Sequence, residues 1–207
     1  MKPIVIGLTG GIACGKSTIA RILKRLGAII IDADTVSKGV VATGSPAWQR
    51  LIDIFGRDIL NPDKSINRRL LGNRVFGNPE RLATLNSIVH PEVTRRITEK
   101  INKYRQSRRW PVIVLDAPLL FEAGADKLVD VVWVVAVDQD TQISRLMNRD
   151  RMEREQAERR ISSQMPLAEK IARADAVINN RGTRRETKDQ ILHLWVHLKQ
   201  GNETETQ

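Results

Sequence analysis

A glycine-rich turn close to the start of this 207-residue chain constrains its fold more than any other feature. The residues Gly10-Gly11-Ile12-Ala13-Cys14-Gly15-Lys16-Ser17 match the pattern GxxxxGKS. Residues 2–8, before the turn, form a short apolar run typical of a buried parallel strand, and residues 16–26, after it, carry apolar side chains at helical spacing. A strand, a glycine loop and a helix in this order predict a phosphate-binding loop in a parallel α/β fold.

Each residue type in the loop has a mechanical reason. Gly10 and Gly15 permit backbone angles and a close approach that a β-carbon would obstruct, so that successive amide N–H groups can surround an anion. Lys16 can neutralise charge shared between the β- and γ-phosphates, and the Ser17 hydroxyl can take one coordination position on Mg²⁺. The residues predicted to bind the phosphates of ATP are Gly10, Gly11, Ile12, Ala13, Cys14, Gly15, Lys16, Ser17 and Thr18.

Cys14 is the single cysteine of the chain, so no internal disulfide can form. A thiol near a helix N-terminus and Lys16 could have thiolate character, which would make the loop sensitive to oxidation. The alternative, which we favour, is a small side chain that only fits its position.

The rest of the chain alternates strands with helices, apart from one long helical segment. Residues 35–104 show several helical patterns but no convincing strand, which indicates a helical insertion. With residues 2–8, four further apolar runs predict five parallel strands: residues 28–32, 112–115, 131–137 and 176–178. Two charged helical segments broken at Pro166 are expected between Asp140 and Arg173, followed by an amphipathic helix and a frayed tail, residues 201–207.

Composition narrows the choice of partners. The formal charge of +10 points to a polyanionic partner, either nucleic acid or a ligand dense in phosphate groups. Only one tyrosine, three phenylalanines and four tryptophans could stack on bases, which disfavours nucleic acid. No apolar run approaches the roughly 20 residues of a membrane span, and no secretion signal is recognised. We therefore expect a cytoplasmic monomer or weak homo-oligomer without nucleic-acid or membrane partners.

Loops of this type serve GTPases, motor ATPases and small-molecule kinases, and other segments separate these classes. Guanine recognition usually brings an NKxD segment, but Asn102-Lys103 is followed by Tyr104-Arg105. Motor ATPases generally have a strand that ends in adjacent acids, whereas the run that ends at Asp116 continues with Ala117-Pro118. A magnesium-dependent, ATP-using kinase of a small molecule fits better.

Phosphorylation of an alcohol requires a carboxylate near the acceptor hydroxyl, because its proton must leave as the oxygen bonds to phosphorus. Asp32 and Asp34 lie at the end of a predicted strand, and if the pair stays extended both side chains point to the same side. We predict Asp34 as the catalytic base, alongside Lys16, and a supporting or metal-ordering role for Asp32. The alternative is that one of the two aspartates merely caps the following helix.

Asp116 ends the third predicted strand, where enzymes with this loop commonly place an acid that orders magnesium through water. We predict that role for Asp116. The alternative is an aspartate that only forms the turn before Ala117-Pro118.

The arginine-rich stretch between Arg145 and Arg160 could act as a lid, which would exclude water and bring positive charge onto the transferring group. Arg145 and Arg149 lie four residues apart, on one helix face, so both could reach phosphates. The alternative is a set of solvated charges on the surface of a basic protein.

A series of motifs spread over most of the chain carries a further resemblance. The motifs are Ile6 to Thr18, Ile31-Asp32-Ala33-Asp34, Arg68 with Leu71 and Val75-Phe76, Leu85 to Ile88 with His90-Pro91, Asp116 to Glu122, and Val177 to Gly182. In this order and spacing they resemble the dephospho-coenzyme A kinases, which move the γ-phosphate of ATP to the ribose 3′-hydroxyl of dephospho-coenzyme A. Cys14 departs from the family pattern, which usually has serine or glycine there.

The resemblance implies one P-loop kinase domain over residues 1–207, with a three-layer α/β fold and a five-stranded parallel sheet in the order 2-3-1-4-5. It implies a helical acceptor-binding subdomain near residues 35–105 and a lid near residues 140–173. ATP and dephospho-coenzyme A would be the substrates, Mg²⁺ the cofactor, and the reaction the last step of coenzyme A biosynthesis.

The same resemblance implies roles for particular side chains. Arg145 and Arg149 would face phosphates, and Asn179, Asn180 and Gly182 would lie near the adenine of ATP. The residues expected to face the acceptor are Asp32, Arg68, His90 and Asp116. His90, before Pro91, could instead be a buried histidine with satisfied hydrogen bonds.

Two rival functions stay open from the sequence. Another P-loop kinase, acting on a nucleoside or nucleotide, would share Lys16, Ser17 and the lid. A basic nucleic-acid-binding module with a regulatory nucleotide site would instead show steeply salt-dependent binding and little dependence on Asp34.

Overall fold

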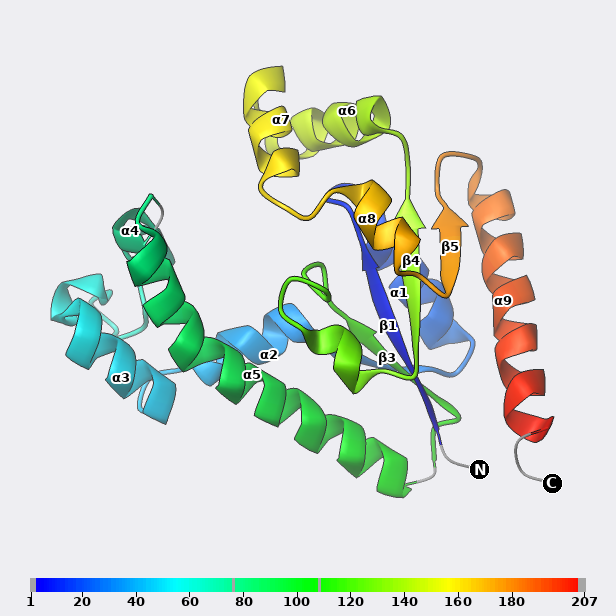
Figure 1. The fold of residues 1–207 in the computed structure, drawn as a ribbon, viewed down its shortest axis with the longest axis horizontal. Coiled ribbons are helices and arrows are strands. Elements are labelled where there is room, and N and C mark those ends of the chain that lie inside the picture. Colours follow the sequence, from blue (N-terminus) through cyan, green and yellow to red (C-terminus); the bar gives the residue numbers. More distant parts are fainter. Residues whose placement is uncertain (1–2, 76, 108, 205–207) are drawn as a thin grey trace. The chain divides into compact units, whose positions relative to one another are not determined.

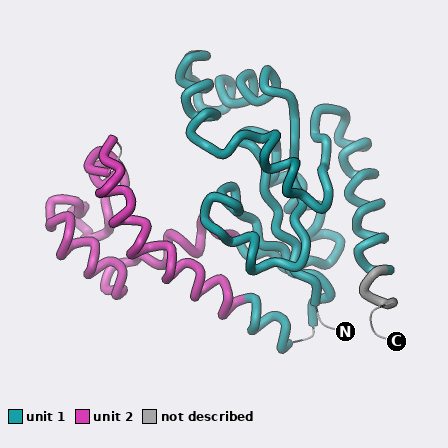
Figure 2. The backbone as a smooth tube through the Cα atoms, in the orientation of Figure 1, with its two compact units in different colours: residues 1–31, 101–207 teal, residues 32–100 magenta. Residues whose placement is uncertain are grey.

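The computed structural model describes residues 3–75, 77–107 and 109–204 and divides into two compact units (Figure 2). Unit 1 comprises residues 1–31 and 101–207, and unit 2 comprises residues 32–100. Phe76, part of one of the motifs, lies outside the described residues, as do residues 205–207 of the expected tail. The assignment of residues 35–105 to acceptor binding and of residues 140–173 to a lid stays a prediction.

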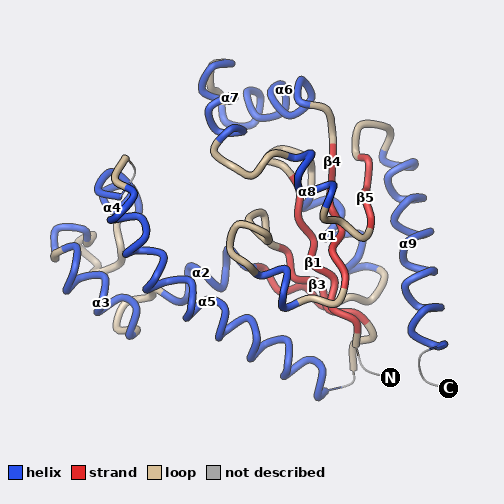
Figure 3. The backbone as a smooth tube through the Cα atoms, in the orientation of Figure 1, coloured by secondary structure: helices blue, strands red, loops and turns tan. Residues whose placement is uncertain are grey.

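A parallel sheet forms the centre of unit 1 (Figures 1 and 3). Within the described residues, five strands follow the order β2-β3-β1-β4-β5, which confirms the expected order. The strands are β1 (Ile4–Gly10), β2 (Ile29–Asp32), β3 (Val112–Asp116), β4 (Val131–Ala136) and β5 (Ala176–Asn179). β1 pairs in parallel with β3 and β4, and β4 pairs in parallel with β5. Strands buried on both faces read as continuous apolar runs, which is why the sequence revealed them.

The two faces of the sheet are covered differently. α1 (Lys16–Arg25) and α9 (Arg184–Thr204) pack on one face, where Leu8, Trp133 and Ile191 belong to one buried apolar cluster. On the other face, a β-carbon at Gly7 would lie 2.8 Å from Leu120 Cδ2, so glycine lets the segment after β3 pack against the strand. The α/β fold class is therefore confirmed.

Three helices occupy the region in which two charged helical segments were expected. They are α6 (Gln139–Asp150), α7 (Arg154–Ser162) and α8 (Leu167–Ala172). The expected break at Pro166 is present, but α6 also ends at Arg151, which adopts a left-handed conformation with φ 51°. Ile143, Leu146 and Ala157 form a small buried cluster that holds α7 on α6.

Unit 2 is helical in its described part, apart from one isolated β-bridge between Leu60 and Ile66. Its elements are α2 (Ala33–Val40), α3 (Pro46–Phe55), the short 3₁₀ helix η1 (Arg57–Ile59), α4 (Arg68–Val75) and the larger part of α5 (Pro79–Ser107). α3 begins after Ser45, whose hydroxyl accepts a hydrogen bond from the Trp48 amide and so caps the helix. Among the described residues of the whole chain, no helix is long and apolar enough to cross a membrane.

Candidate active site

The glycine loop between β1 and α1 adopts the conformation that its sequence requires. Gly15 precedes α1 with φ 87° and ψ 22°, a left-handed conformation that glycine adopts without strain. The first turn of α1 contains no acidic residue, and no side chain caps it. Its N-terminal amide groups and the positive end of its dipole therefore favour an anion at this loop.

The glycines are also required by the packing of the loop against the rest of unit 1. A β-carbon at Gly10 would collide with the carbonyl oxygen of Val135 in β4. A β-carbon at Gly15 would collide with the side-chain amide of Asn180, which follows β5. The sequence argument assigned these glycines to ligand approach, and the structure adds that each one admits a neighbouring segment of the protein.

Asn180 joins three elements around the loop. Its Nδ2 donates to the carbonyl oxygen of Cys14 at 2.8 Å, and its Oδ1 accepts from the buried hydroxyl of Thr187 at 3.0 Å. Its own carbonyl oxygen accepts from Arg145 Nη2 at 3.0 Å. The structure thus brings two predicted site residues, Asn180 and Arg145, onto the loop and gives Asn180 a bracing role that the sequence did not reveal.

Cys14 is packed as an ordinary buried side chain. It is fully buried, and Gln142 Nε2 in α6 donates to its sulfur at 3.1 Å. Burial raises the pKa of the Cys14 thiol above its usual value, and this effect outweighs the hydrogen bonds that lower it. The raised pKa argues against thiolate character, and the burial supports the alternative of a small side chain that fits.

Lys16 and Asp116 form an ion pair at the loop. The Lys16 ammonium contacts Asp116 Oδ1, and both side chains are largely buried, with 15% and 13% of their surfaces exposed. The Ala117 amide donates to the carbonyl oxygen of Leu8 at 3.0 Å, which fixes the backbone next to Asp116. The carboxylate predicted to order a metal and the lysine predicted to bind phosphates therefore lie together.

The oxygen donors around this pair suit magnesium bound with a nucleotide. Ser17, in the first turn of α1, supplies a hydroxyl, and Asp116 supplies a carboxylate, both hard ligands of the kind that Mg²⁺ prefers. No group of three or more His, Cys, Asp or Glu side chains in the described part of the chain could hold a metal by itself. The residues fit an ion that takes most of its ligands from phosphates and water.

Asp32 and Asp34 do not form the extended pair that their spacing suggested. Asp32 is the N-cap of α2, where its Oδ1 accepts a hydrogen bond from the Thr35 amide at 2.9 Å. Asp34 lies in the first turn of that helix, and both side chains are exposed. The argument that both carboxylates point to one side of a strand was therefore wrong, and the capping alternative is confirmed for Asp32.

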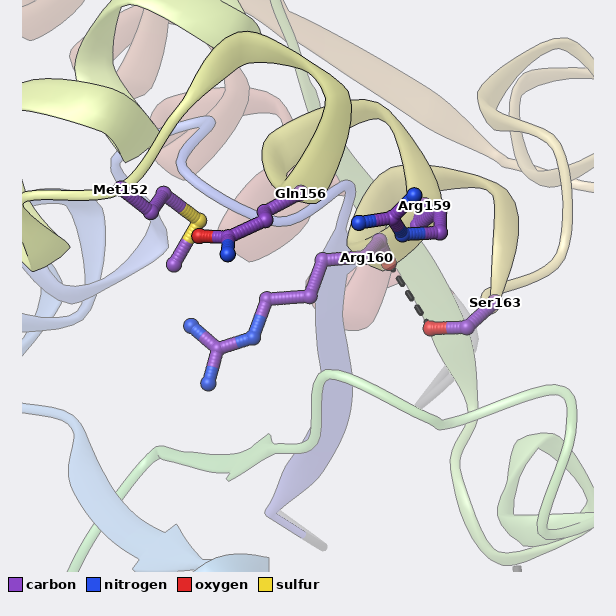
Figure 4. Close-up of a pocket in the computed structure, with 5 residues that line it drawn as sticks. All are labelled: Met152, Gln156, Arg159, Arg160 and Ser163. Carbon is purple, nitrogen blue, oxygen red and sulfur yellow. Dashed lines mark hydrogen bonds between the residues drawn. The ribbon is translucent and has the colours of Figure 1, made fainter.

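The arginines of the lid region have different partners. Arg145 contacts the segment after β5, whereas the Arg149 guanidinium pairs with the neighbouring Asp150 at 2.8 Å and lowers the pKa of that carboxyl. A surface pocket of about 420 Å³ on α7 is lined by Met152, Gln156, Arg159, Arg160 and Ser163 (Figure 4). Arg160 also pairs with Asp150 at 2.6 Å. Of the two predicted phosphate ligands, Arg145 is linked to the loop indirectly, through the hydrogen bonds of Asn180, whereas the partner of Arg149 is Asp150.

Comparison with known proteins places the chain in a family. The family model for dephospho-CoA kinase matches residues 4–186. The chain belongs to the dephospho-CoA kinase family. The dephospho-CoA kinase of Carboxydothermus hydrogenoformans is 52% identical over 191 residues, which is 92% of each chain. The one of Geobacter metallireducens is 48% identical over 93% of this chain and 95% of its own.

A solved structure agrees with this assignment. The dephospho-CoA kinase from Campylobacter jejuni is 28% identical and superimposes with a TM-score of 0.73, over 96% of this chain and 98% of its own. The suspected family resemblance is confirmed, and the chain is a kinase.

Arg68 and His90 lie in unit 2. The resemblance to the dephospho-CoA kinases predicted that both bind the acceptor. Arg68 is the first residue of α4, His90 lies within α5, and both are exposed. His90 is therefore not the buried histidine of the alternative interpretation. Its exposure is compatible with a ligand-binding role, which stays a prediction.

The segment that the dephospho-CoA kinase pattern places near adenine is fixed by side chains of α9. Gln190 exchanges two hydrogen bonds of 2.9 Å with the backbone of Asn179. Thr183 and Glu186 form a capping box, and a β-carbon at Gly182 would collide with the Glu186 carboxylate. The spacing Thr-x-x-Glu could have predicted this helix start, but nothing in the sequence marked Gln190 or the buried Thr187.

Proposed function

We propose that this chain transfers the γ-phosphoryl group of ATP to the ribose 3′-hydroxyl of dephospho-coenzyme A, giving coenzyme A and ADP. The observation that carries the proposal is the Lys16–Asp116 pair beside a complete phosphate-binding loop, in a chain of the dephospho-CoA kinase family. Membership in the family supports dephospho-coenzyme A as the acceptor, and the phosphate-binding loop supports ATP as the phosphate donor.

The loop and Lys16 would hold the phosphates of ATP. When ATP binds, the Lys16 ammonium would exchange its contact with Asp116 for oxygens of the β- and γ-phosphates. The positive charge would then lie where negative charge builds up on the bridging oxygen as its bond to the γ-phosphorus breaks. ADP leaves with that oxygen.

Asp34 would receive the proton of the acceptor. The 3′-hydroxyl oxygen bonds to the γ-phosphorus as its proton passes to the Asp34 carboxylate. An exposed carboxylate in the first turn of a helix is accessible to a substrate, which supports this role. Asp32 would support it by fixing the start of α2.

Mg²⁺ would be held by the Ser17 hydroxyl and, through water, by Asp116. The ion, when bound, neutralises negative charge on the β- and γ-phosphates.

The remaining residues would position the two substrates. Arg145, already joined to the loop through Asn180, would reach the phosphates, and Arg149 would do so on release from Asp150. Asn179, Asn180 and Gly182 would border the adenine of ATP. Arg68 and His90 would bind the acceptor. We also infer a cytoplasmic monomer or weak homo-oligomer without nucleic-acid partners.

The test combines one assay with a matched pair of variants. Purified protein receives ATP and Mg²⁺ with dephospho-coenzyme A or with a panel of nucleosides and nucleotides, and the phosphorylated product is identified by mass. Selective formation of coenzyme A is expected. Phosphorylation of another acceptor, or no acceptor-dependent turnover, would contradict the proposal.

In Lys16→Ala the rate of phosphoryl transfer should fall by a factor of about 10³ while the protein stays folded. Lys24→Ala, at an exposed lysine of the same helix, is the control and should retain normal turnover. Normal turnover of a folded Lys16→Ala variant would remove the loop from the mechanism.

A further inference from the structure

Lys170, in α8, is a buried charge that the mechanism above does not use. Its side chain is fully buried, and it is the one charged side chain among the buried residues of the described chain. Its ammonium donates to the carbonyl oxygen of Pro118 at 2.9 Å and pairs with Glu122 Oε1 at 2.8 Å. A buried ammonium is unfavourable unless it is paired and hydrogen-bonded, and an apolar side chain often fills such a position equally well. The contacts that Lys170 makes therefore indicate what it is for.

The first contact leads to the phosphate loop. The Pro118 carbonyl oxygen accepts from Lys170 and also from the hydroxyl of Thr9, at 3.1 Å. Thr9 is fully buried in β1, one residue before the glycine loop. Pro118 itself follows Asp116 by two residues, so Lys170 and Thr9 together hold the backbone that carries the Asp116 carboxylate.

The second contact leads to the end of the lid region. Glu122 Oε1, the partner of Lys170, also accepts from the amide of Met165 at 3.1 Å. Met165 lies in the connection between α7 and α8, and this connection lines a cavity of about 570 Å³ together with Gly11 and Ile12 of the loop. The buried ammonium of Lys170 thus links the segment that follows β3 to the connection between α7 and α8.

We propose that Lys170 is a positioning residue for phosphoryl transfer. It sets the Asp116 backbone through Pro118, and it anchors the connection between α7 and α8 through Glu122. This proposal rests on the kinase function proposed above. If it is right, removal of the ammonium displaces groups around the transferring phosphate and lowers kcat, whereas a lysine that only stabilises the fold would change the melting temperature alone.

The test replaces the charge and keeps the length of the side chain. Lys170→Met should fold, and its kcat should fall about 10- to 100-fold, because a small misplacement of positioned groups costs that much. KM for ATP and for dephospho-coenzyme A should stay within about 3-fold of the wild type. Lys188→Met, at an exposed lysine of α9, is the matched control and should have normal kinetics. A folded Lys170→Met variant with kcat within about 2-fold of the wild type would overturn the proposal.

A second variant covers the case in which Lys170→Met does not fold. Glu122→Gln removes the partner's charge but keeps an oxygen that can accept from the Met165 amide. Its kcat should fall at least about 3-fold with unchanged KM, and where both single variants fold, the double variant should be no slower than Lys170→Met, since the two side chains act as one unit. Unchanged kcat in Glu122→Gln would overturn the proposal.

Amide hydrogen exchange separates a failure of this proposal from a failure of the proposed function. If the wild type forms no coenzyme A, the function is wrong, and the positioning role is judged on the amides of Met165 and Ala117, which donate to Glu122 and to Leu8. Both amides should exchange faster in Lys170→Met, or in Glu122→Gln if the former does not fold, than in Lys188→Met. Equal exchange rates would overturn the positioning role.

Discussion

The phosphate loop of unit 1 and the predicted acceptor residues of unit 2 are built in opposite ways. Around the loop, Lys16 pairs with Asp116, and Asn180 is bonded to both the Cys14 carbonyl and Arg145. The predicted acceptor and catalytic side chains of unit 2 are exposed: Asp32, Asp34, Arg68 and His90. The comparison teaches that the predicted nucleotide site is held by an ion pair and hydrogen bonds within unit 1, whereas the predicted acceptor side chains of unit 2 are exposed to solvent.

This contrast determines how substitutions should behave. A change at Gly10 or Gly15 should affect stability and nucleotide binding together, because the backbone that packs on neighbouring segments is also the backbone predicted to bind phosphate. A change at an exposed unit 2 residue that caps no helix should affect catalysis with little effect on stability, since such positions usually change the free energy of unfolding by less than about 0.5 kcal/mol.

Asp34→Asn should give the largest separation of catalysis from stability. The amide cannot take the proton of the acceptor, so kcat should fall about 10³-fold, within the usual range for loss of a general base. MgATP affinity and the melting temperature should stay near those of the wild type. Steady-state kinetics and calorimetry measure these quantities.

The matched control for this variant is Asp53→Asn, at an exposed aspartate of α3 that accepts a hydrogen bond from the side chain of Gln49. It should retain normal turnover. Normal turnover in Asp34→Asn would move the base to another carboxylate, with Asp32 and Asp116 as the next candidates.

Gly15→Ala should lower both the stability of the protein and its affinity for MgATP. Alanine would have to adopt the left-handed backbone conformation of Gly15, and its β-carbon would collide with the side-chain amide of Asn180. Together these effects should lower the free energy of unfolding by about 3 kcal/mol. MgATP affinity should fall as well. Denaturant unfolding and nucleotide titration measure the two effects.

Gly27→Ala separates strain from collision. Gly27 also has a positive φ, 101°, but nothing lies within 4 Å of its β-carbon position. The free energy of unfolding of Gly27→Ala should fall by only about 1 kcal/mol, and its affinity for MgATP should stay that of the wild type. If both variants behave alike, the packing of the loop on Asn180 is not what makes glycine necessary.

Much of unit 1 could be predicted from the sequence, because its signals are local. The glycine loop, the strands and the break at Pro166 each follow from residue types with few alternatives. The contact between Asn180 and Cys14 spans 166 positions of sequence, and no local pattern reports it. Asn180 was therefore expected near adenine without any sign that it braces the loop.

The positions that could not be predicted from the sequence share a physical cause. Lys170 and Arg151 occur in charged stretches that look uniformly solvated, yet one is buried and the other ends a helix in a left-handed conformation. Asp32 and Asp34 lie at a boundary between strand and helix, where a shift of one residue changes which way a side chain points. Only tertiary packing decides such positions.

Substitutions of Asp32 should have smaller effects, and they separate a capping role in unit 2 from a catalytic one. Asp32→Ala removes the cap of α2 and should cost about 1 kcal/mol of stability. Asp32→Ser keeps a capping oxygen and should restore that stability. If Asp32→Ser also has normal kcat, the role of Asp32 is capping alone, and a lower kcat at restored stability would assign it a part in catalysis or metal ordering.

Cys14 should give the smallest effect. Because burial raises the pKa of its thiol, the thiolate fraction at neutral pH is below that of an ordinary cysteine, and labelling of native protein by iodoacetamide should be slow and should quicken as the pH rises. Cys14→Ser should keep nearly normal kinetics. Rapid labelling at neutral pH with loss of activity would restore the redox hypothesis.

Calorimetric titration of MgATP into Lys16→Ala and Asp34→Asn, side by side, tests the central contrast most directly. Both variants should fail to make coenzyme A, but for different reasons. The account predicts that Lys16→Ala loses nucleotide affinity while Asp34→Asn binds MgATP like the wild type. Equal losses of affinity in the two variants, or normal affinity in Lys16→Ala, would contradict it.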